Sequence, residues 1–278
     1  NHRSNMDYML VTYLAGEASA SSYAVGEWAR VWPLSGLIRS MGAYFIRRKS
    51  RGALYRKVLA RYVQKATEGG VTQAVFPEGG LSLDGKLMPP KMGLLGYVVG
   101  ADLTDRDVVF VPVAINYDRV LEDRVLIEAD LAGTRRFKAR ISVILIFILR
   151  KTWLRIRGRF MRFGEAAVVF GEPVPLRDYG DKPDVDRLAQ DLMGRIADEM
   201  PLLFVPLMAH LMLSTKTPLT EDALRAEMAR LLKKAKPTID IPHADFDGAV
   251  QKAREHMVQR GMLIAVDGGF AADPDELP

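Results

Sequence analysis

Residues 76–82 of this chain read Phe-Pro-Glu-Gly-Gly-Leu-Ser. They begin at the last residue of a segment, residues 71–76, that is typical of a β-strand. Two consecutive glycines after a strand permit positive φ angles and a close approach of the backbone to a ligand. Amide groups exposed at such a turn can bind a phosphate or an oxyanion. We therefore interpret residues 77–90 as an anion-binding loop, although a plain glycine turn after a strand is the alternative.

Helical and strand-like segments alternate on both sides of this loop. The expected helices cover residues 8–17, 28–41, 54–67 and 92–99. The expected strands cover residues 43–46, 71–76, 108–115 and 168–170. The alternation predicts an α/β domain over residues 1–200, with a mixed, largely parallel sheet flanked by helices.

The remainder of the chain, residues 201–278, has a different pattern and is expected to form a small, mostly helical domain. Residues 202–213 are strongly apolar, and Thr220 is placed to cap a helix that runs to about Lys234. A second helix over residues 246–260 and a short strand over 262–266 complete this region.

Composition narrows the possible chemistry. The chain has 278 residues and no cysteine, which excludes disulfides, thiolate zinc sites and a cysteine nucleophile.

The net charge is +5, and residues 138–162 hold eight lysines and arginines and no acidic residue. The apolar run at 141–149 inside this segment is shorter than the roughly 20 residues that a transmembrane helix needs. We expect residues 138–162 to lie at an anionic membrane surface, the alternative being a core element with solvated basic ends.

The first residues supply a candidate acid–base pair. His2 is followed, after four residues, by Asp7. A hydroxyl is a poor nucleophile near neutral pH, so a base must take its proton, and histidine titrates in that range. A carboxylate bonded to the other ring nitrogen would fix the tautomer and stabilise the imidazolium. His2 and Asp7 are therefore candidate catalytic residues, unless they are an ordinary loop histidine and a helix-capping aspartate.

Two other segments add possible ligand contacts. The strand at 43–46 ends in Arg47 and Arg48, and arginine suits bidentate phosphate recognition, although a solvated basic strand end would look the same. Pro112 interrupts the apolar segment 108–115, which implies an edge strand or a bulge. Its role is either structural or the shaping of a substrate pocket.

Together these segments resemble the glycerolipid acyltransferase superfamily. Its motif blocks are H-x4-D, G-x-x-F-I-x-R, F-x-E-G-x-R-S and V-P-[IV], and they match residues 2–7, 42–48, 76–82 and 111–113 in the same order. Residues 84–87 and 90–93 are also similar to the bacterial membrane-bound glycerol-3-phosphate acyltransferases and their dihydroxyacetone-phosphate relatives. The resemblance covers residues 1–175.

The resemblance implies a direct transfer of a fatty acyl group from acyl-CoA or acyl-carrier protein to the 1-hydroxyl of glycerol 3-phosphate, in phospholipid biosynthesis. His2 would be the general base and Asp7 its partner. The substrate-binding residues would be Arg47, Arg48, Glu78, Gly79, Gly80, Ser82, Lys86 and Pro112. The thioester donor is a co-substrate, and no metal or other cofactor is implied.

The same resemblance predicts a peripheral or monotopic protein at the cytoplasmic face of the cell membrane, docked through residues 138–162, with no nucleic-acid partner. Because His2 stands at the very start without an upstream strand, we expect the chain to be an N-terminally truncated piece of its domain.

One position departs from the family pattern. Residue 81 is leucine where the third block usually has arginine, so one phosphate ligand is missing. Arg47, Lys86 or Lys91 could supply the charge, or the acceptor could be dihydroxyacetone phosphate or 1-acylglycerol 3-phosphate instead. A lipid-binding protein without activity is another alternative. The helix–helix–strand order of residues 217–270 also leaves open a winged-helix-like DNA-binding protein.

Overall fold

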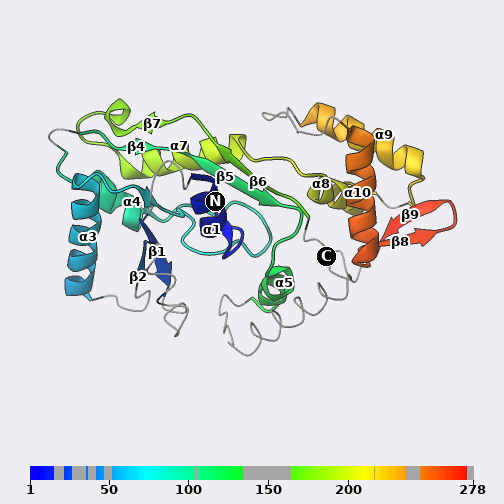
Figure 1. Ribbon diagram of the computed structural model, residues 1–278, viewed down its shortest axis with the longest axis horizontal. Helices are drawn as coiled ribbons and strands as arrows, with labels where there is room; N and C mark the ends of the chain where they lie inside the picture. The colour runs from blue at the N-terminus through cyan, green and yellow to red at the C-terminus, as the bar shows by residue number, and fades with distance from the viewer. Residues whose placement is uncertain are drawn as a thin grey trace. The chain divides into compact units, whose positions relative to one another are not determined.

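The computed structural model describes residues 1–15, 22–26, 36, 42–46, 52–103, 106–133, 164–215, 217–235 and 245–273 (Figure 1). The chain is a mixed α/β protein that divides into two compact units. The first unit comprises Asn1–Val113, Leu121–Arg162 and Phe170–Ala197. The second comprises Ala114–Val120, Phe163–Val169 and Asp198–Pro278.

The first unit contains a small parallel sheet. Its strands are β1 (Ser22–Gly26), β2 (Ala43–Ile46) and β3 (Gln73–Ala74), in the order β2-β1-β3. Tyr23 at the centre pairs with Ala43 on one side and Ala74 on the other, both in parallel register. A separate antiparallel pair joins β4 (Val109–Phe110) to β7 (Val174–Pro175).

Helices α1 (Asp7–Ala15), α3 (Ala53–Glu68), α4 (Met92–Val99), α5 (Asp123–Leu131) and α7 (Val185–Asp198) accompany these strands, with a 3-10 turn at Leu176–Tyr179. Helix α3 buries Val63 and Thr67, and it ends where Gly70 takes a φ of 73°. A positive φ is accessible to glycine at little cost, so the chain can leave the helix and enter β3 within a few residues.

The core of the first unit forms between α4, β7 and α7. Leu95 of α4 packs with Val174 of β7 and with Leu188 and Leu192 of α7. In α7 the buried residues are Leu188, Ala189, Leu192, Met193 and Ile196, a spacing that puts all of them on one face. Burial of this face anchors the helix to the strands.

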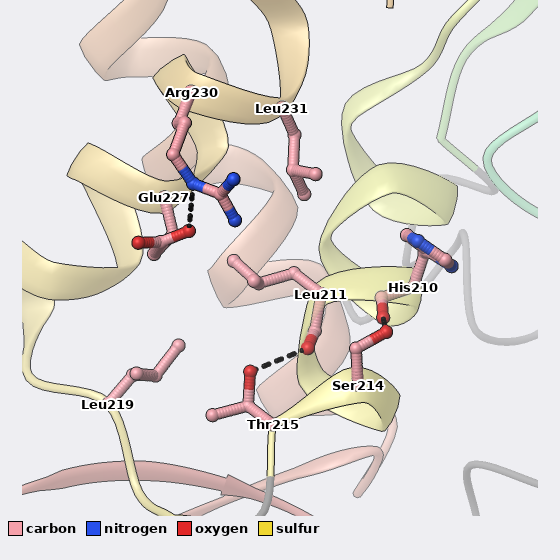
Figure 2. A pocket seen from close by; sticks show the side chains of 8 residues that line it. All are labelled: His210, Leu211, Ser214, Thr215, Leu219, Glu227, Arg230 and Leu231. Atoms are coloured by element: carbon pink, nitrogen blue, oxygen red, sulfur yellow. Dashed lines mark hydrogen bonds and ion pairs between the residues drawn. The ribbon is translucent and has the colours of Figure 1, made fainter. Parts of the chain in front are cut away.

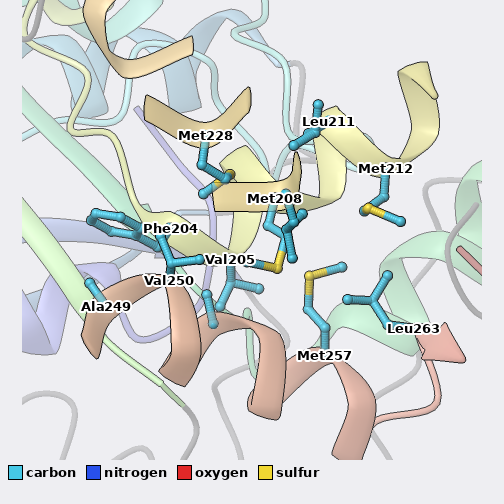
Figure 3. Packing of buried hydrophobic residues seen from close by; sticks show 12 residues of the cluster. Phe204, Val205, Met208, Leu211, Met212, Met228, Ala249, Val250, Met257 and Leu263 are labelled. Atoms are coloured by element: carbon cyan, nitrogen blue, oxygen red, sulfur yellow. The ribbon is translucent and has the colours of Figure 1, made fainter. Parts of the chain in front are cut away.

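The second unit is built around methionine. Helices α8 (Phe204–Ser214), α9 (Glu221–Lys234) and α10 (Phe246–Gln259) enclose Met208, Met228 and Met257, which are fully buried (Figure 3). Methionine has a flexible, unbranched side chain that fills irregular gaps between helices. Strands β5 (Val113–Tyr117) and β6 (Ala166–Phe170) pair in another part of this unit.

A hairpin of β8 (Leu263–Val266) and β9 (Gly269–Ala272) closes the second unit. Leu219, just before α9, exchanges backbone hydrogen bonds with Phe270 of the hairpin, at 2.9 and 2.8 Å. A Cβ on Gly269 would overlap the Leu219 carbonyl oxygen, so this close backbone approach requires glycine.

Most of the helices expected from the sequence are confirmed within one or two residues, as are the strands at 43–46 and 262–266. The continuous strand expected over 108–115 is wrong, because Val111 and Pro112 separate β4 from β5. Proline has no N–H for a ladder hydrogen bond and therefore breaks the strand. The strand expected over 71–76 shortens to β3.

Within the described residues, β2, β1 and β3 pair in parallel, whereas the pairs β4–β7 and β8–β9 are antiparallel. The expected helix at 28–41 lies outside the described residues except for Gly36, and so does the whole basic segment 138–162. No helix in the described part of the chain combines the length and the hydropathy that crossing a bilayer requires.

The start of α9 offers a test of the second unit. The Thr220 hydroxyl accepts a hydrogen bond from the Ala223 N–H at 3.2 Å, as the sequence predicts for a cap. Thr220→Ala should lower the free energy of unfolding by about 1 kcal/mol, because a backbone donor at the helix start loses its acceptor. Thr220→Ser keeps the oxygen and should restore most of the loss in urea denaturation. Equal stability of the alanine variant and the wild type would contradict the assignment of this cap.

Candidate active site

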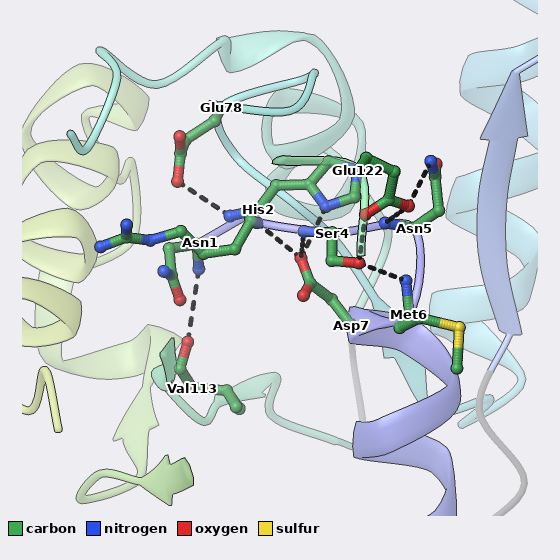
Figure 4. A network of polar contacts seen from close by, with 10 residues as sticks. Asn1, His2, Ser4, Asn5, Met6, Asp7, Glu78, Val113 and Glu122 are labelled. Carbon is green, nitrogen blue, oxygen red and sulfur yellow. Dashed lines mark hydrogen bonds and ion pairs between the residues drawn. The ribbon is translucent and has the colours of Figure 1, made fainter. Parts of the chain in front are cut away.

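The His2 and Asp7 side chains meet directly (Figure 4). His2 Nδ1 lies 2.9 Å from Asp7 Oδ2, and the same oxygen accepts the backbone N–H of Arg3 at 2.7 Å and of Ser4 at 3.0 Å. Asp7 is the first residue of α1 and is fully buried, whereas the His2 side chain is 16% exposed. The four residues between the two therefore form a loop that turns the carboxylate back onto the imidazole.

This contact determines which ring nitrogen can act on a ligand. A carboxylate oxygen only accepts hydrogen bonds, so in the neutral ring Nδ1 carries the hydrogen and Nε2 carries the lone pair. The ring also stacks on Phe76, with centroids 4.2 Å apart and planes inclined by 21°. Asp7 and Phe76 together fix the orientation of the imidazole ring.

Residues of the loop after β3 hold the backbone of His2. The Glu78 carboxylate accepts the His2 N–H at 3.0 Å through Oε1 and the Met88 N–H at 3.3 Å through Oε2. The Ser82 N–H donates to the His2 carbonyl at 2.9 Å. Glu78 and Ser82 are both buried, and these hydrogen bonds fix the position of the His2 backbone.

The far end of this loop is closed by its own polar groups. The Ser82 hydroxyl donates to the Lys86 carbonyl at 2.7 Å, and Asp84 accepts the Lys86 N–H at 3.0 Å. The Lys86 ammonium lies 2.9 Å from Asp84, and their pairing raises the pKa of Lys86 and lowers the pKa of Asp84. Lys86 is thus placed at the loop but already has an acidic partner.

Glu122 holds the residues between His2 and Asp7, and reasoning from the sequence missed it. Its Oε2 accepts the Ser4 hydroxyl at 2.8 Å, and its Oε1 accepts the Asn5 backbone N–H at 3.1 Å and the Asn5 side-chain amide at 2.9 Å (Figure 4). These partners are 117 and 118 residues apart in the chain, so no local spacing could reveal the contact.

Pro112 lies beside the same loop through its neighbours. The Asn1 backbone nitrogen donates to the Val113 carbonyl at 3.3 Å, and the buried Pro112 accepts a hydrogen bond from the Gly171 N–H at 2.8 Å. Gly79 and Gly80 follow Glu78 in the turn. Arg47 and Arg48 lie outside the described residues. The structure thus brings His2, Asp7, Glu78 and Ser82 into one network.

Comparison with known proteins matches both halves of the chain. Residues 1–116 match the family model Acyltransferase, and residues 152–272 match the glycerol-3-phosphate acyltransferase C-terminal region. The chain belongs to the glycerolipid acyltransferase superfamily. The first of these matches contains the complete His2–Asp7–Glu78–Ser82 network.

Several curated relatives carry the name glycerol-3-phosphate acyltransferase. The protein of Aeromonas hydrophila is 32% identical over 268 residues, which are 87% of this chain and 32% of the relative. The protein of Xanthomonas campestris is 31% identical over 88% of this chain and 29% of its own length. The protein of Pseudoalteromonas atlantica is 29% identical over 90% and 34%. The chain spans about a third of the length of these relatives.

The second unit contains a cavity of about 430 Å³ between α8 and α9 (Figure 2). Four of its five polar side chains are bonded within the protein. Arg230 pairs with Glu227 at 2.7 Å, and the hydroxyls of Ser214 and Thr215 donate to the carbonyls of His210 and Leu211 in the preceding helical turn. Of the site residues expected from the sequence, none that the structure describes lines this cavity.

The buried Glu78 carboxylate yields a stability prediction. Glu78→Gln should lower the free energy of unfolding by about 1–3 kcal/mol, because the amide can present an oxygen to His2 or to Met88 but not to both. The other backbone N–H then faces the NH₂ group. Urea denaturation of the purified chain measures the effect.

Glu128→Gln is the matched control, because Glu128 is exposed on α5. It should leave the midpoint of unfolding unchanged. If Glu78→Gln and Glu128→Gln behave alike, the Glu78 carboxylate does not hold the loop in solution.

Proposed function

We propose that this chain carries the acyl-transfer site of a glycerol-3-phosphate acyltransferase. The reaction moves a fatty acyl group from the thioester of acyl-CoA or acyl-carrier protein to the 1-hydroxyl of glycerol 3-phosphate, for phospholipid biosynthesis. One observation supports this more than any other: the partly exposed His2 ring is held through Nδ1 by the buried Asp7, which leaves Nε2 as a base. The names of the relatives agree with it.

In the proposed reaction, His2 Nε2 takes the proton of the acceptor hydroxyl while the hydroxyl oxygen attacks the thioester carbonyl carbon. The C–O bond forms, the C–S bond breaks, and the thiolate leaves with the proton returned by the imidazolium. An ester and a free thiol result, without an acyl-enzyme intermediate. Asp7 stabilises the imidazolium and prevents the ring from rotating, as in other acid–base relays built on histidine.

The remaining site residues have separate proposed roles. Glu78 and Ser82 position His2 through its backbone, and Gly79 and Gly80 form the turn that faces the acceptor. Arg47 and Arg48 end the second motif block and are proposed to bind the acceptor phosphate, with Lys86 at the edge of the loop. Pro112 shapes the wall of the acyl site. No metal and no other cofactor is proposed.

We also propose a domain division, a location and a membrane contact. Residues 1–200 form the acyltransferase α/β domain, with β2-β1-β3 in a larger, mostly parallel sheet, and residues 201–278 form a mostly helical C-terminal domain. The protein acts at the cytoplasmic face of the membrane as a peripheral or monotopic protein. Residues 138–162 supply the docking surface, because their cations and apolar run suit an anionic interface.

The acceptor has two close alternatives, dihydroxyacetone phosphate and 1-acylglycerol 3-phosphate, since Leu81 stands where the family pattern has arginine. DNA binding is not proposed. Helices α9 and α10 and the hairpin β8–β9 do follow one another as in a winged helix. However, they lie within residues 152–272, which match the acyltransferase C-terminal region.

His2→Ala should lower turnover by about 10²–10⁴-fold, because the hydroxyl loses its base. The measurement is thiol release from palmitoyl-CoA and from palmitoyl-carrier protein, in lipid vesicles, with each of the three acceptors. Acceptor-dependent release by the wild type identifies the acceptor.

His210→Ala is the control histidine variant, since His210 is exposed on α8, which belongs to the second unit. It should keep wild-type turnover. Turnover by His2→Ala that equals the His210→Ala rate would exclude His2 as the base, and absence of thiol release with every donor and acceptor would contradict the proposed function.

A further inference from the structure

Two glycines of the loop after β3 are each approached by a cationic side chain. Gly79 has a φ of 65° and Gly85 a φ of 78°. A Cβ on Gly79 would lie 2.7 Å from Lys91 Cδ and 3.1 Å from Lys91 Nζ. A Cβ on Gly85 would lie 2.7 Å from Arg3 Nη1. Any side chain at either glycine would displace the cation that lies against it.

Both cations are fixed to the site by their backbones. Lys91 donates its N–H to the Pro77 carbonyl at 2.8 Å, next to Glu78. Arg3 follows His2 directly and donates its N–H to Asp7 at 2.7 Å. Lys91 and Arg3 are therefore attached to the two segments that carry the base and the turn.

Neither of these two side chains is neutralised by an ion pair in the described part of the chain. Within the described ranges, neither Lys91 Nζ nor the Arg3 guanidinium has a carboxylate within ion-pair distance. Burial lowers the pKa of Arg3, while the charges of Glu78, Asp7 and Asp84 act in the opposite direction. Lys86, the other cation of the loop, is paired with Asp84 at 2.9 Å.

We propose that Lys91 and Arg3 form the subsite for the phosphate group of the acyl acceptor, in place of the arginine that is missing at position 81. This inference rests on the proposed function and assigns two ligands of the acceptor. A phosphate monoester carries nearly two negative charges and needs cations that are not already neutralised. A partly dehydrated guanidinium binds a phosphate more strongly than a fully solvated one, because the local dielectric constant is lower.

The arrangement also explains two residue choices. Glycine at 79 and at 85 leaves the space through which Lys91 and Arg3 reach the loop, in addition to permitting the positive φ. Leucine at 81 is tolerable because the charge is delivered from residue 91, ten positions further along the chain. Lys86 cannot replace Lys91 without breaking its pair with Asp84.

The test compares Lys91→Met and Arg3→Met with Lys57→Met, which removes an exposed lysine of α3. Equilibrium dialysis with radiolabelled glycerol 3-phosphate measures acceptor binding without any reaction, and dihydroxyacetone phosphate and 1-acylglycerol 3-phosphate are measured as competitors. Initial rates of thiol release give KM for the acceptor and for palmitoyl-CoA separately. Unfolding curves check that each variant is folded.

We expect Lys91→Met and Arg3→Met each to raise the acceptor Kd and KM by about 10–100-fold, the loss of one charge-assisted contact, with an unchanged KM for palmitoyl-CoA. Lys57→Met should change them less than about twofold, because the Lys57 charge is exposed to solvent on α3, outside the motif blocks. Leu81→Arg added to Lys91→Met should recover part of the affinity, because it restores a cation on the same turn.

Wild-type affinity in folded Lys91→Met and Arg3→Met, together with normal wild-type turnover, would overturn this subsite and leave the proposed function intact. An equal rise of KM for acceptor and donor would also overturn it, since a general distortion of the loop explains that result. If the wild type neither binds nor acylates any of the three acceptors, the subsite and the proposed function both fail.

Discussion

The buried Asp7 carboxylate is the contact on which the site depends. One of its oxygens accepts hydrogen bonds from the His2 ring and from the backbones of Arg3 and Ser4. Removing that oxygen would leave three donors without this acceptor in a largely water-free place, at a cost well above that of a single exposed hydrogen bond. The same oxygen therefore shapes the loop, fixes the imidazole and selects Nε2 as the basic nitrogen. The hydrogen bonds to this oxygen thus support both the local structure and the proposed chemistry.

This contact is supported from two distant parts of the chain. Glu78 and Ser82 hold the backbone of His2 from the loop after β3, and Glu122 holds Ser4 and Asn5 from the start of α5. Two buried residues of the third motif block thus hold the backbone of the candidate base. Gly79 of this block and Gly85 just after it leave room for Lys91 and Arg3, the two cations that we propose for the acceptor. The groups that hold the His2 backbone are therefore different from the cations that we propose for the acceptor.

The sequence predicted those features that depend on neighbouring residues. The cap of α9, the periodicity of α3, α4, α9 and α10, and the His2–Asp7 contact all arise within a few positions of the chain. Prediction failed where distant segments decide, as in the contacts of Glu122 and the course of Lys91 over Gly79. Pro112 shows an intermediate case, since its interruption of a strand was foreseeable but the split into β4 and β5, which pair with different partners, was not. Glu78 was expected at a substrate, and only the long-range contact with the His2 N–H reveals its positioning role.

The tautomer of the His2 ring decides whether Asp7 controls the base. The chain has four histidines, so ¹⁵N labelling of histidine gives few NMR signals, and His2→Gln identifies the one that matters. We predict a neutral ring with its hydrogen on Nδ1 and a bare Nε2, and we predict that Asp7→Asn abolishes this preference. A wild-type His2 ring with its hydrogen on Nε2, or an Nδ1–H form that persists without the Asp7 carboxylate, would contradict this role of Asp7.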